Sequence, residues 1–275
     1  VINVSQFSTS VNGYTITFIN SALMALPAQT LAWQWGKSAG GSDYEYCSQI
    51  IPDGNGNTYT TGNFTSDTLV FGSSVLINTD TANNAGDLFI VKYDSLGNVV
   101  WAKSAGGVAG DNSVGIGHDA AGNLYTAGTS NSDTIIFGTT SYVNNLGFYI
   151  AKYDTSGNVI WIKGNNGSSS HGVYLAGIAV DANGNSYVTG YFGAHLLILD
   201  TDTLVNADST GYDVFIAKYD NQGNVVWAKR AGGYETEEST GIALDQNGYL
   251  YLTGWFEGTY MLFGGNYVNN PYPPR

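Results

Sequence analysis

Short apolar runs separated by turn residues, with no helical periodicity, dominate this chain. Around Asn112 the pattern predicts four strands: Ser113–Gly117, Leu124–Thr129, Gly147–Tyr153 and Val159–Lys163. Runs of this length bounded by Gly, Asn and Asp are typical of antiparallel strands. Asp-x-x-Gly-Asn turns join the first strand to the second and the third to the fourth, giving two hairpins. The connection between the hairpins carries a further short apolar stretch, Ile135–Gly138.

This pattern recurs about every 64 residues. The phrase Tyr93–Lys103 returns at Tyr153–Lys163 and Tyr219–Lys229; the phrase Asp53–Gly62 returns at Asp119–Gly128, Asp181–Gly190 and Asp245–Gly254. Self-similarity at a fixed long period indicates one supersecondary unit stacked several times.

The third strand of each repeat predicts how the units stack. In the first repeat, Phe89, Val91 and Tyr93 would lie on one face and Leu88 and Ile90 on the other, so both faces are apolar. A sheet that is buried on both faces must lie between neighbouring layers. We therefore predict an all-β fold, a β-propeller of four-stranded antiparallel blades built from about four repeats. The repeats are placed at 43–103, 109–163, 171–229 and, in part, 238–270.

The two ends of the chain predict complementary half-blades. Thr30–Gly41 resembles a fourth strand with its linker, Gly13–Asn20 alternates like a strand, and the last repeat supplies only two main strands plus Phe263-Gly264. These halves either pair to close a four-bladed ring or belong to a longer propeller. Residues 1–30 are set apart from the repeats at 31–270. Within them, Ala22–Ala28 resembles the end of a secretion signal.

Charge and composition exclude several classes of function. The net charge of -13, with only two arginines, argues against a nucleic-acid surface, which would need clustered cations. No apolar run is long enough for a membrane span, so no membrane insertion is expected. Cys47 is the only cysteine, which excludes an intramolecular disulfide, and we expect it to be a small buried hydrophobe. No cofactor or bound metal is predicted.

The repeated phrases resemble a known family. Asp181–Gly190, Asp213–Asp220, Gly223–Trp227 and Ala231–Gly233 are similar to the SBBP β-propeller repeat, over roughly Trp33–Asn269. The resemblance implies an exported protein of the bacterial surface, often of Bacteroidetes and often secreted by a type IX route. It brings no catalytic residues with it. Expected partners are proteins or glycans of the bacterial surface, or components of the secretion machinery, and the expected location is extracellular.

Several recurring signals are better explained as scaffold. The Asp-x-Asn-Gly-Asn turns look like the opening of a calcium loop but lack its distal Glu, so we predict side-chain caps of tight turns. Trp101, Trp161 and Trp227 recur at one position, which favours packing between blades. Lys92, Lys152 and Lys218 recur too, and are expected either to snorkel toward solvent or to pair with a turn Asp.

Residues outside the repeat register are the candidate contacts. Trp255, Phe256 and Tyr260 are predicted to form an exposed aromatic contact, and Tyr234 and Glu235 lie in a loop that differs between repeats. Gly164–Gly172 is another such loop. The candidate O-glycosylation residues, in Asp-Thr-apolar triplets that also fit a turn, are Thr68, Thr134 and Thr203.

Two functions follow from these observations. The first is a non-enzymatic extracellular module for binding or structure in a bacterial surface or secreted assembly. The second is a carbohydrate-active hydrolase or lyase that uses channel carboxylates such as Asp43, Asp111 or Glu238.

Overall fold

The computed structural model describes residues 35–80, 85–143, 147–165, 172–206 and 211–270. It divides into two units, Val1–Gly36 and Lys37–Arg275, and all described strands belong to the second. Within the described ranges every regular element is a β-strand, which confirms the all-β prediction. No described segment forms a helix long and apolar enough to cross a membrane. The signal-like stretch Ala22–Ala28 and the strand expected at Gly13–Asn20 lie outside the described residues.

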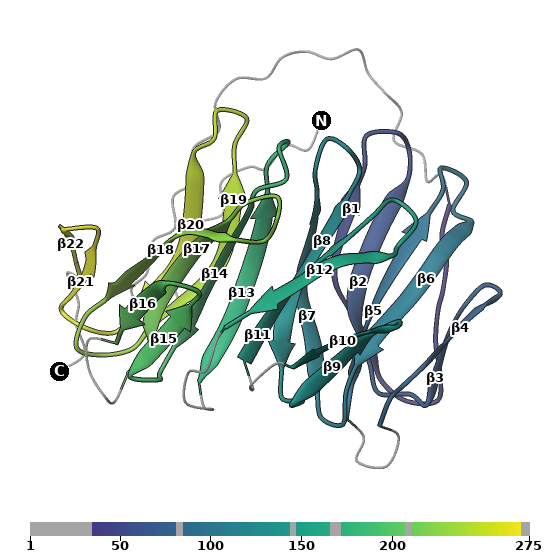
Figure 1. Ribbon diagram of the computed structural model, residues 1–275, viewed down its shortest axis with the longest axis horizontal. Helices are drawn as coiled ribbons and strands as arrows, with labels where there is room; N and C mark the ends of the chain where they lie inside the picture. The colour runs from purple at the N-terminus through teal and green to yellow at the C-terminus, as the bar shows by residue number, and fades with distance from the viewer. Residues whose placement is uncertain (1–34, 81–84, 144–146, 166–171, 207–210, 271–275) are drawn as a thin grey trace, which may run out of the picture. The chain divides into compact units, whose positions relative to one another are not determined.

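The four predicted strands form the main sheet of each of the first three repeats (Figure 1). In the first repeat these strands are β1 (Glu45–Pro52), β2 (Thr58–Phe64), β5 (Asp87–Tyr93) and β6 (Val99–Gly106). In the second they are β7 (Asp111–His118), β8 (Leu124–Ser130), β11 (Gly147–Tyr153) and β12 (Val159–Gly164). In the third they are β13 (Val173–Val180), β14 (Ser186–Phe192), β17 (Asp213–Tyr219) and β18 (Val225–Gly232), and the fourth has only β19 (Glu237–Leu244) and β20 (Leu250–Phe256). Neighbouring strands are antiparallel, as predicted. The described sheets do not close into a ring, so the blade number stays a prediction.

Each repeat also contains a short hairpin that the sequence pattern showed only in part. The hairpins are β3 (Thr68–Phe71) with β4 (Ser74–Ile77), β9 (Thr134–Phe137) with β10 (Thr140–Val143), β15 (Leu196–Leu199) with β16 (Asp202–Val205), and β21 (Tyr260–Phe263) with β22 (Asn266–Asn269). Their two-residue turns begin at a positive φ, for example 62° at Gly138, which suits the twist of a tight hairpin.

Two of these hairpins, β9–β10 and β21–β22, join consecutive repeats, whereas β15–β16 forms a sheet of its own. Gly106 of β6 pairs with Ile136 of β9, and Gly232 of β18 pairs with Leu262 of β21. A single bridge between Gly40 and Val70 has the same separation along the chain. This bridge supports a fourth-strand position for Gly40, as the resemblance of Thr30–Gly41 to a fourth strand predicts.

Apolar side chains fill the space between successive sheets. Between the second and third repeats, the fully buried rings of Phe148 and Phe215 stack with centroids 5.6 Å apart. The third strands β5, β11 and β17 are almost entirely buried, which confirms that both of their faces are covered. Burial of apolar area contributes about 25 cal/mol per Å², so this layered packing is the main source of stability.

Cys47 corrects the expectation of a buried thiol. It lies on β1 and is exposed, with Sγ 2.9 Å from Oγ1 of Thr60. The corresponding strands β7, β13 and β19 each pack on the sheet of the preceding repeat. No such sheet covers β1 in the described part of the chain, so its face stays open.

The acidic turns use their carboxylates to cap their own backbone. Asp94 Oδ1 accepts hydrogen bonds from the N–H groups of Leu96 (2.9 Å) and Asn98 (2.8 Å), and the Asn98 amide donates to Asp94 Oδ2. Gly97 supplies the positive φ of 75°. The same bonds recur at Asp154 and Asp220, and at Asp53 and Asp181 in the Asp-x-Asn-Gly-Asn turns that look like calcium loops. The turn interpretation is confirmed, because these oxygens already serve the chain.

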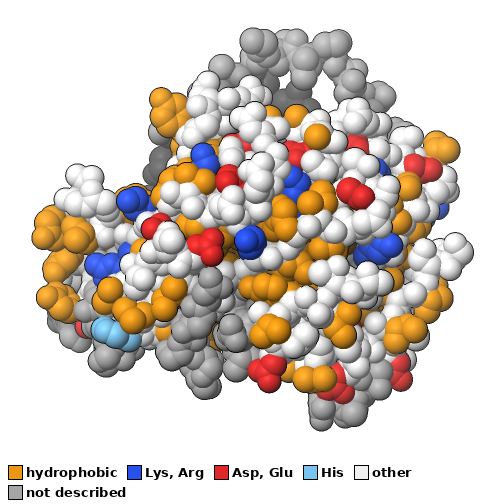
Figure 2. Space-filling model, in the orientation of Figure 1, with side chains coloured by type: hydrophobic (Ala, Val, Ile, Leu, Met, Phe, Trp, Pro, Cys, Tyr) orange, Lys and Arg blue, Asp and Glu red, His pale blue; other side chains and the backbone are white. Residues whose placement is uncertain are grey.

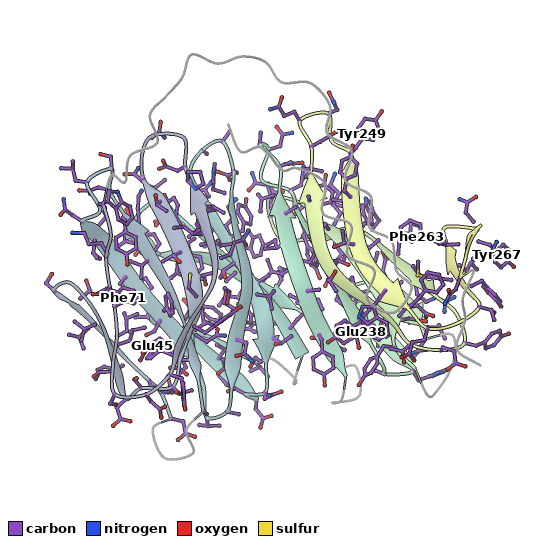
Figure 3. All side chains as sticks on the ribbon, turned by 180° about the vertical axis from the view of Figure 1, so that it is seen from behind. Glu45, Phe71, Glu238, Tyr249, Phe263 and Tyr267 are labelled. Carbon is purple, nitrogen blue, oxygen red and sulfur yellow. The ribbon has the colours of Figure 1, made fainter. Side chains whose placement is uncertain are left out.

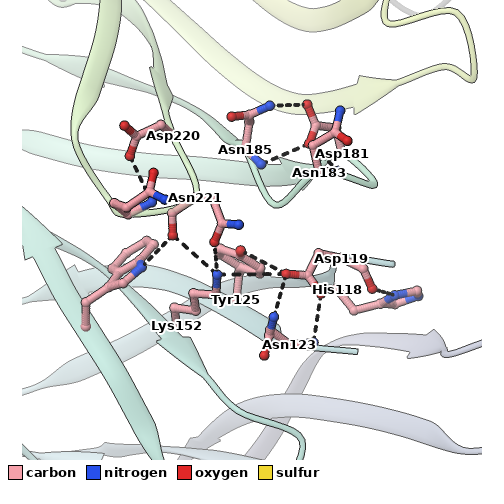
Figure 4. Close-up of polar contacts among 12 residues, drawn as sticks. His118, Asp119, Asn123, Tyr125, Lys152, Asp181, Asn183, Asn185, Asp220 and Asn221 are labelled. Atoms are coloured by element: carbon pink, nitrogen blue, oxygen red, sulfur yellow. Dashed lines mark hydrogen bonds and ion pairs between the residues drawn. The ribbon is translucent and has the colours of Figure 1, made fainter. Parts of the chain in front are cut away.

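The recurring tryptophans Trp101 and Trp161 each contact the acidic turn of the next repeat, as expected, and Figure 4 labels Asp220 and Asn221 of one such turn. Trp161 Nε1 on β12 donates to the carbonyl of Asn221, 3.0 Å away in the acidic turn of the following repeat. Its ring lies on Gly223, where an added Cβ would be only 3.1 Å from the indole. Trp101 and the carbonyl of Thr155 repeat this contact one unit earlier. We call it the tryptophan clasp.

A buried lysine completes the contact between these repeats. Lys152 Nζ lies 3.8 Å from Oδ2 of Asp119, above the ring of Tyr125, and also donates to the carbonyl and side chain of Asn221. Both partners of the ion pair are nearly fully buried. Lys92 lies over Tyr59 and Lys218 over Tyr187 in the same way, so the lysines are scaffold too.

Replacing the clasp tryptophan should destabilise the protein in two steps. Trp161→Phe removes the hydrogen bond and should cost about 1 kcal/mol, whereas Trp161→Ala also removes ring packing and should cost about 3 kcal/mol. Urea unfolding measures both. Trp227→Phe is the matched control, because no following turn is present among the described residues; an equal loss there would contradict the clasp.

The turn caps should make stability depend on acid pH. Hydrogen bonds from Asn98 hold the pKa of Asp94 below its usual value, and the backbone and side chain of Asn158 do the same for Asp154. A lowered folded-state pKa stabilises above the unfolded value, and this contribution is lost as pH falls through the folded pKa. Carboxyl NMR titration should show Asn98→Ala raising the pKa of Asp94 toward about 3.9. Asp154 should not move; a general shift of both would contradict local capping.

Candidate functional site

An apolar groove of about 520 Å³ opens beside the incomplete fourth repeat. Its walls come from β19, β20 and the β21–β22 hairpin, and its floor includes Val214 of β17 and Ala231 of β18. Figure 3 shows Glu238 on β19 and Phe263 on β21 at its two sides. Figure 2 shows hydrophobic side chains gathered on the surface over β21 and β22. We call this the β20 groove.

The groove opens along β20 because no third strand pairs with it among the described residues. β2, β8 and β14 each pair on one edge with a first strand and on the other with a third strand. β20 pairs with β19 only, in the described part of the chain. The effect is seen at one repeat position: Tyr59 is 2% exposed and Tyr125 0%, whereas Tyr251 is 56% exposed. An open strand edge with an apolar face is a template for another strand.

Two of the predicted contact residues line this groove. Trp255, 43% exposed, and Phe256 both belong to β20 and contribute to its wall. Tyr260 lies beside the groove, at the start of β21. Its ring meets those of Tyr234 (centroids 6.5 Å) and Tyr267 (5.2 Å), so Tyr234 is part of an aromatic cluster next to the groove.

Leu252, Met261 and Phe263 also line the groove, and the sequence analysis did not single them out. Leu252 occupies the repeat position of Val188, which is fully buried. Leu252 is only partly buried, because no described strand covers that face of β20. The sequence signal for Leu252 is its repeat position, which is a core position in the preceding repeat.

The electrostatic character of the groove is weakly acidic. Burial, together with the nearby Glu257 carboxylate, raises the pKa of Glu238. The charge of Asp245 raises the pKa of the exposed Tyr251, whose hydroxyl donates to Asp245 Oδ2 at 3.3 Å. A basic side chain entering the groove would therefore meet favourable charge.

The remaining candidates lie elsewhere on the surface. Glu235 is exposed in the turn before β19, and part of the Gly164–Gly172 loop lies outside the described residues. Thr68, Thr134 and Thr203 are all exposed. Thr68 and Thr134 begin β3 and β9, but Thr203 lies on the second hairpin strand β16, so the three positions are not equivalent.

Asp43 is exposed just before β1, and the other two carboxylates considered for an enzyme, Asp111 and Glu238, lie on strands that are not neighbours. Asp111 begins β7 and is fully buried, so it has no access to a substrate. Glu238 lies on β19, and β13 lies between β7 and β19. No three His, Cys, Asp or Glu side chains converge on a possible metal position within the described ranges.

Comparison with known proteins agrees with this architecture. Residues 226–255 match the family model of the SBBP repeat, described as a β-propeller repeat, so the chain carries a repeat of this type. The match runs from β18 through β19 to β20 and so crosses from one repeat into the next.

Two curated relatives are similar over part of the chain. A WD repeat-containing protein of Acanthamoeba polyphaga mimivirus is 27% identical over 207 residues, which is 63% of this chain and 15% of that protein. The regulatory protein FlaEY of Caulobacter vibrioides is 30% identical over 106 residues, 38% of this chain and 11% of that protein. The aligned regions thus span only small parts of these longer relatives. The chain thus carries a β-propeller repeat, and part of it is similar to part of a WD repeat-containing protein.

Proposed function

We propose that this chain is a non-enzymatic binding and structural module that holds a protein partner by adding a strand of that partner to β20. The observation that carries the proposal is the exposed edge of β20 beside the β20 groove. Strand addition uses main-chain hydrogen bonds for affinity and side-chain pockets for specificity.

The preceding repeats define the strand that fits. β14 pairs with β17 from Ser186 opposite Tyr219 to Phe192 opposite Asp213. In that arrangement Lys218 lies over the Tyr187 ring, 5.2 Å from its centroid. A partner strand with the β17 pattern Asp-Val-Phe-Ile-Ala-Lys-Tyr would place its lysine over Tyr251. The charge of Asp245 beside that ring favours this basic residue.

The setting we propose is a secreted or cell-surface assembly of a bacterium, and the resemblance to SBBP repeats supports this. The partner classes proposed for the added strand are surface proteins and protein components of the secretion machinery; a surface glycan would bind elsewhere on the module. The proposal keeps residues 1–30 as a separate segment and 31–270 as propeller repeats.

Hydrogen exchange tests the strand addition directly. Amides of Leu250–Phe256 should exchange faster than those of Ser186–Phe192 in the chain alone. A peptide with the sequence of Asp213–Tyr219 should slow the β20 amides about tenfold or more and leave β14 unchanged. The matched controls are a peptide with Glu in place of its lysine and the protein variant Tyr251→Ala, both of which should weaken protection.

Two results would contradict this proposal. One is that β20 is already as protected as β14 without peptide, which means that the chain fills its own edge. The other is that the peptide leaves β20 exchange unchanged.

We also propose that Thr68, Thr134 and Thr203 carry O-linked glycans, supported by their Asp-Thr-apolar triplets and their exposure. The intact mass of protein from its native source should exceed that of the polypeptide. The excess should fall with each Thr→Val substitution. A native mass equal to the bare polypeptide disproves the modification.

A further inference from the structure

Two buried carboxylates lie near each other between the first and second repeats. Asp87 begins β5 and is 1% exposed, and Asp111 begins β7 and is 0% exposed. The Asp111 N–H donates to the carbonyl of Gly86 (2.8 Å), and the Gly107 N–H donates to Asp111 Oδ2 (2.6 Å). Asp87 Oδ1 lies against Gly106, where an added Cβ would come within 1.8 Å of it. The Gly106-Gly107 linker thus touches both carboxylates.

In each of the two carboxylates, Oδ2 accepts hydrogen bonds and Oδ1 accepts none from the described residues. Asp87 Oδ2 accepts from the N–H and hydroxyl of Thr79, both at 2.8 Å, and Asp111 Oδ2 also accepts from the Ser132 hydroxyl at 2.9 Å. Neither Oδ1 atom accepts a hydrogen bond within the described part of the chain. A buried carboxylate oxygen without a partner is costly, and two near each other are more so. Burial, with Asp111 nearby, raises the pKa of Asp87 to about 6.

The equivalent interface two repeats later contains an arginine that the Asp87–Asp111 interface lacks. There Asp213 begins β17, Glu237 begins β19, and the Gly233 N–H donates to Glu237 Oε2 at 2.8 Å. The Arg230 guanidinium binds Asp213 Oδ2 at 2.7 Å and brings a positive charge into this acidic pair. Arg230 pairs with Phe215 on the sheet, and in the first repeat Ser104 pairs with Phe89 at the same register position.

The interface between the second and third repeats has no acid at either of these two positions. Gly147 and Val173 begin β11 and β13, so neither acid is present, and the buried Asn165 accepts a hydrogen bond from the Phe148 N–H at 2.9 Å. A pair of acids occurs with an arginine in one interface, and no acids occur in the next. Only the Asp87–Asp111 interface has two acids and a serine where the arginine would be.

We propose that Asp87 and Asp111 hold a hard divalent cation through their Oδ1 atoms, and that this cation supplies the positive charge that the Arg230 guanidinium supplies to the acids of the later interface. Ca²⁺ is the ion that fits best, because it prefers carboxylate, carbonyl and hydroxyl oxygens and accepts water as a ligand. The bonds from Thr79, Ser132 and Gly107 would fix the two carboxylates in place, as outer hydrogen bonds do at metal sites. The site joins two repeats and is independent of the β20 groove.

Thermal unfolding with and without Ca²⁺ tests this site. The Tm in millimolar Ca²⁺ should be about 3 °C or more above the Tm in the presence of a chelator. Titration calorimetry should show that the protein binds Ca²⁺. Asp87→Asn and Asp111→Asn should abolish both effects. Ser104→Arg supplies the missing cation, so it should abolish Ca²⁺ binding while keeping the Tm near that of the Ca²⁺-bound protein. Arg230→Ser is the matched control and should create a second calcium-responsive site.

Three results would overturn the proposal. The first is a Tm that Ca²⁺ does not change. The second is Ca²⁺ binding that persists in Ser104→Arg, which places the ion elsewhere. The third is a Tm that depends on pH but not on Ca²⁺, which means that the pair shares a proton. Ser104→Arg alters neither carboxylate. Its Ca²⁺ binding therefore tests the proposed site even if an Asp→Asn variant fails to fold.

Discussion

The structure depends on the attachment of each repeat to the next, because a single four-stranded sheet with two apolar faces cannot be stable alone. Three contacts make this attachment: apolar packing between sheets, the tryptophan clasp, and the short hairpin that pairs with the preceding fourth strand. The packing supplies most of the free energy, since each buried ring removes far more apolar area from water than one hydrogen bond can match. The clasp and hairpin fix the register between repeats.

The same rule explains where the molecule can bind. Where no described third strand covers a repeat, residues at core positions become accessible: Tyr251 is 56% exposed, and Leu252 is only partly buried. The groove therefore lies at the position that a third strand occupies in the preceding repeats. The side chains that fit it are those of these preceding third strands.

Much of this could be predicted from the sequence, because repetition amplifies weak signals. One Asp-x-x-Gly-Asn turn is ambiguous, but its recurrence at Asp53, Asp119 and Asp181 fixes the hairpins. The second strand of each short hairpin escaped prediction, because strands such as β10 are exposed and have no apolar face. Cys47 was expected to be buried, which fails because β1 has no covering sheet in the described chain. The Asp87–Asp111 pair also escaped prediction, since only the structure brings the starts of β5 and β7 together.

The central claim is that β20 accepts a third strand in the register of its predecessors, and cross-linking tests it most directly. A Cys47→Ser, Thr253→Cys protein would be mixed with Asp213–Tyr219 peptides that carry one cysteine at successive positions. Thr189 lies opposite Ile216 in the third repeat, so Thr253→Cys should form a disulfide with the peptide cysteine at the Ile216 position. Cysteines at the Phe215 and Ala217 positions point to the other face and should react poorly. Equal cross-linking at all three positions, or none at any, would contradict the account.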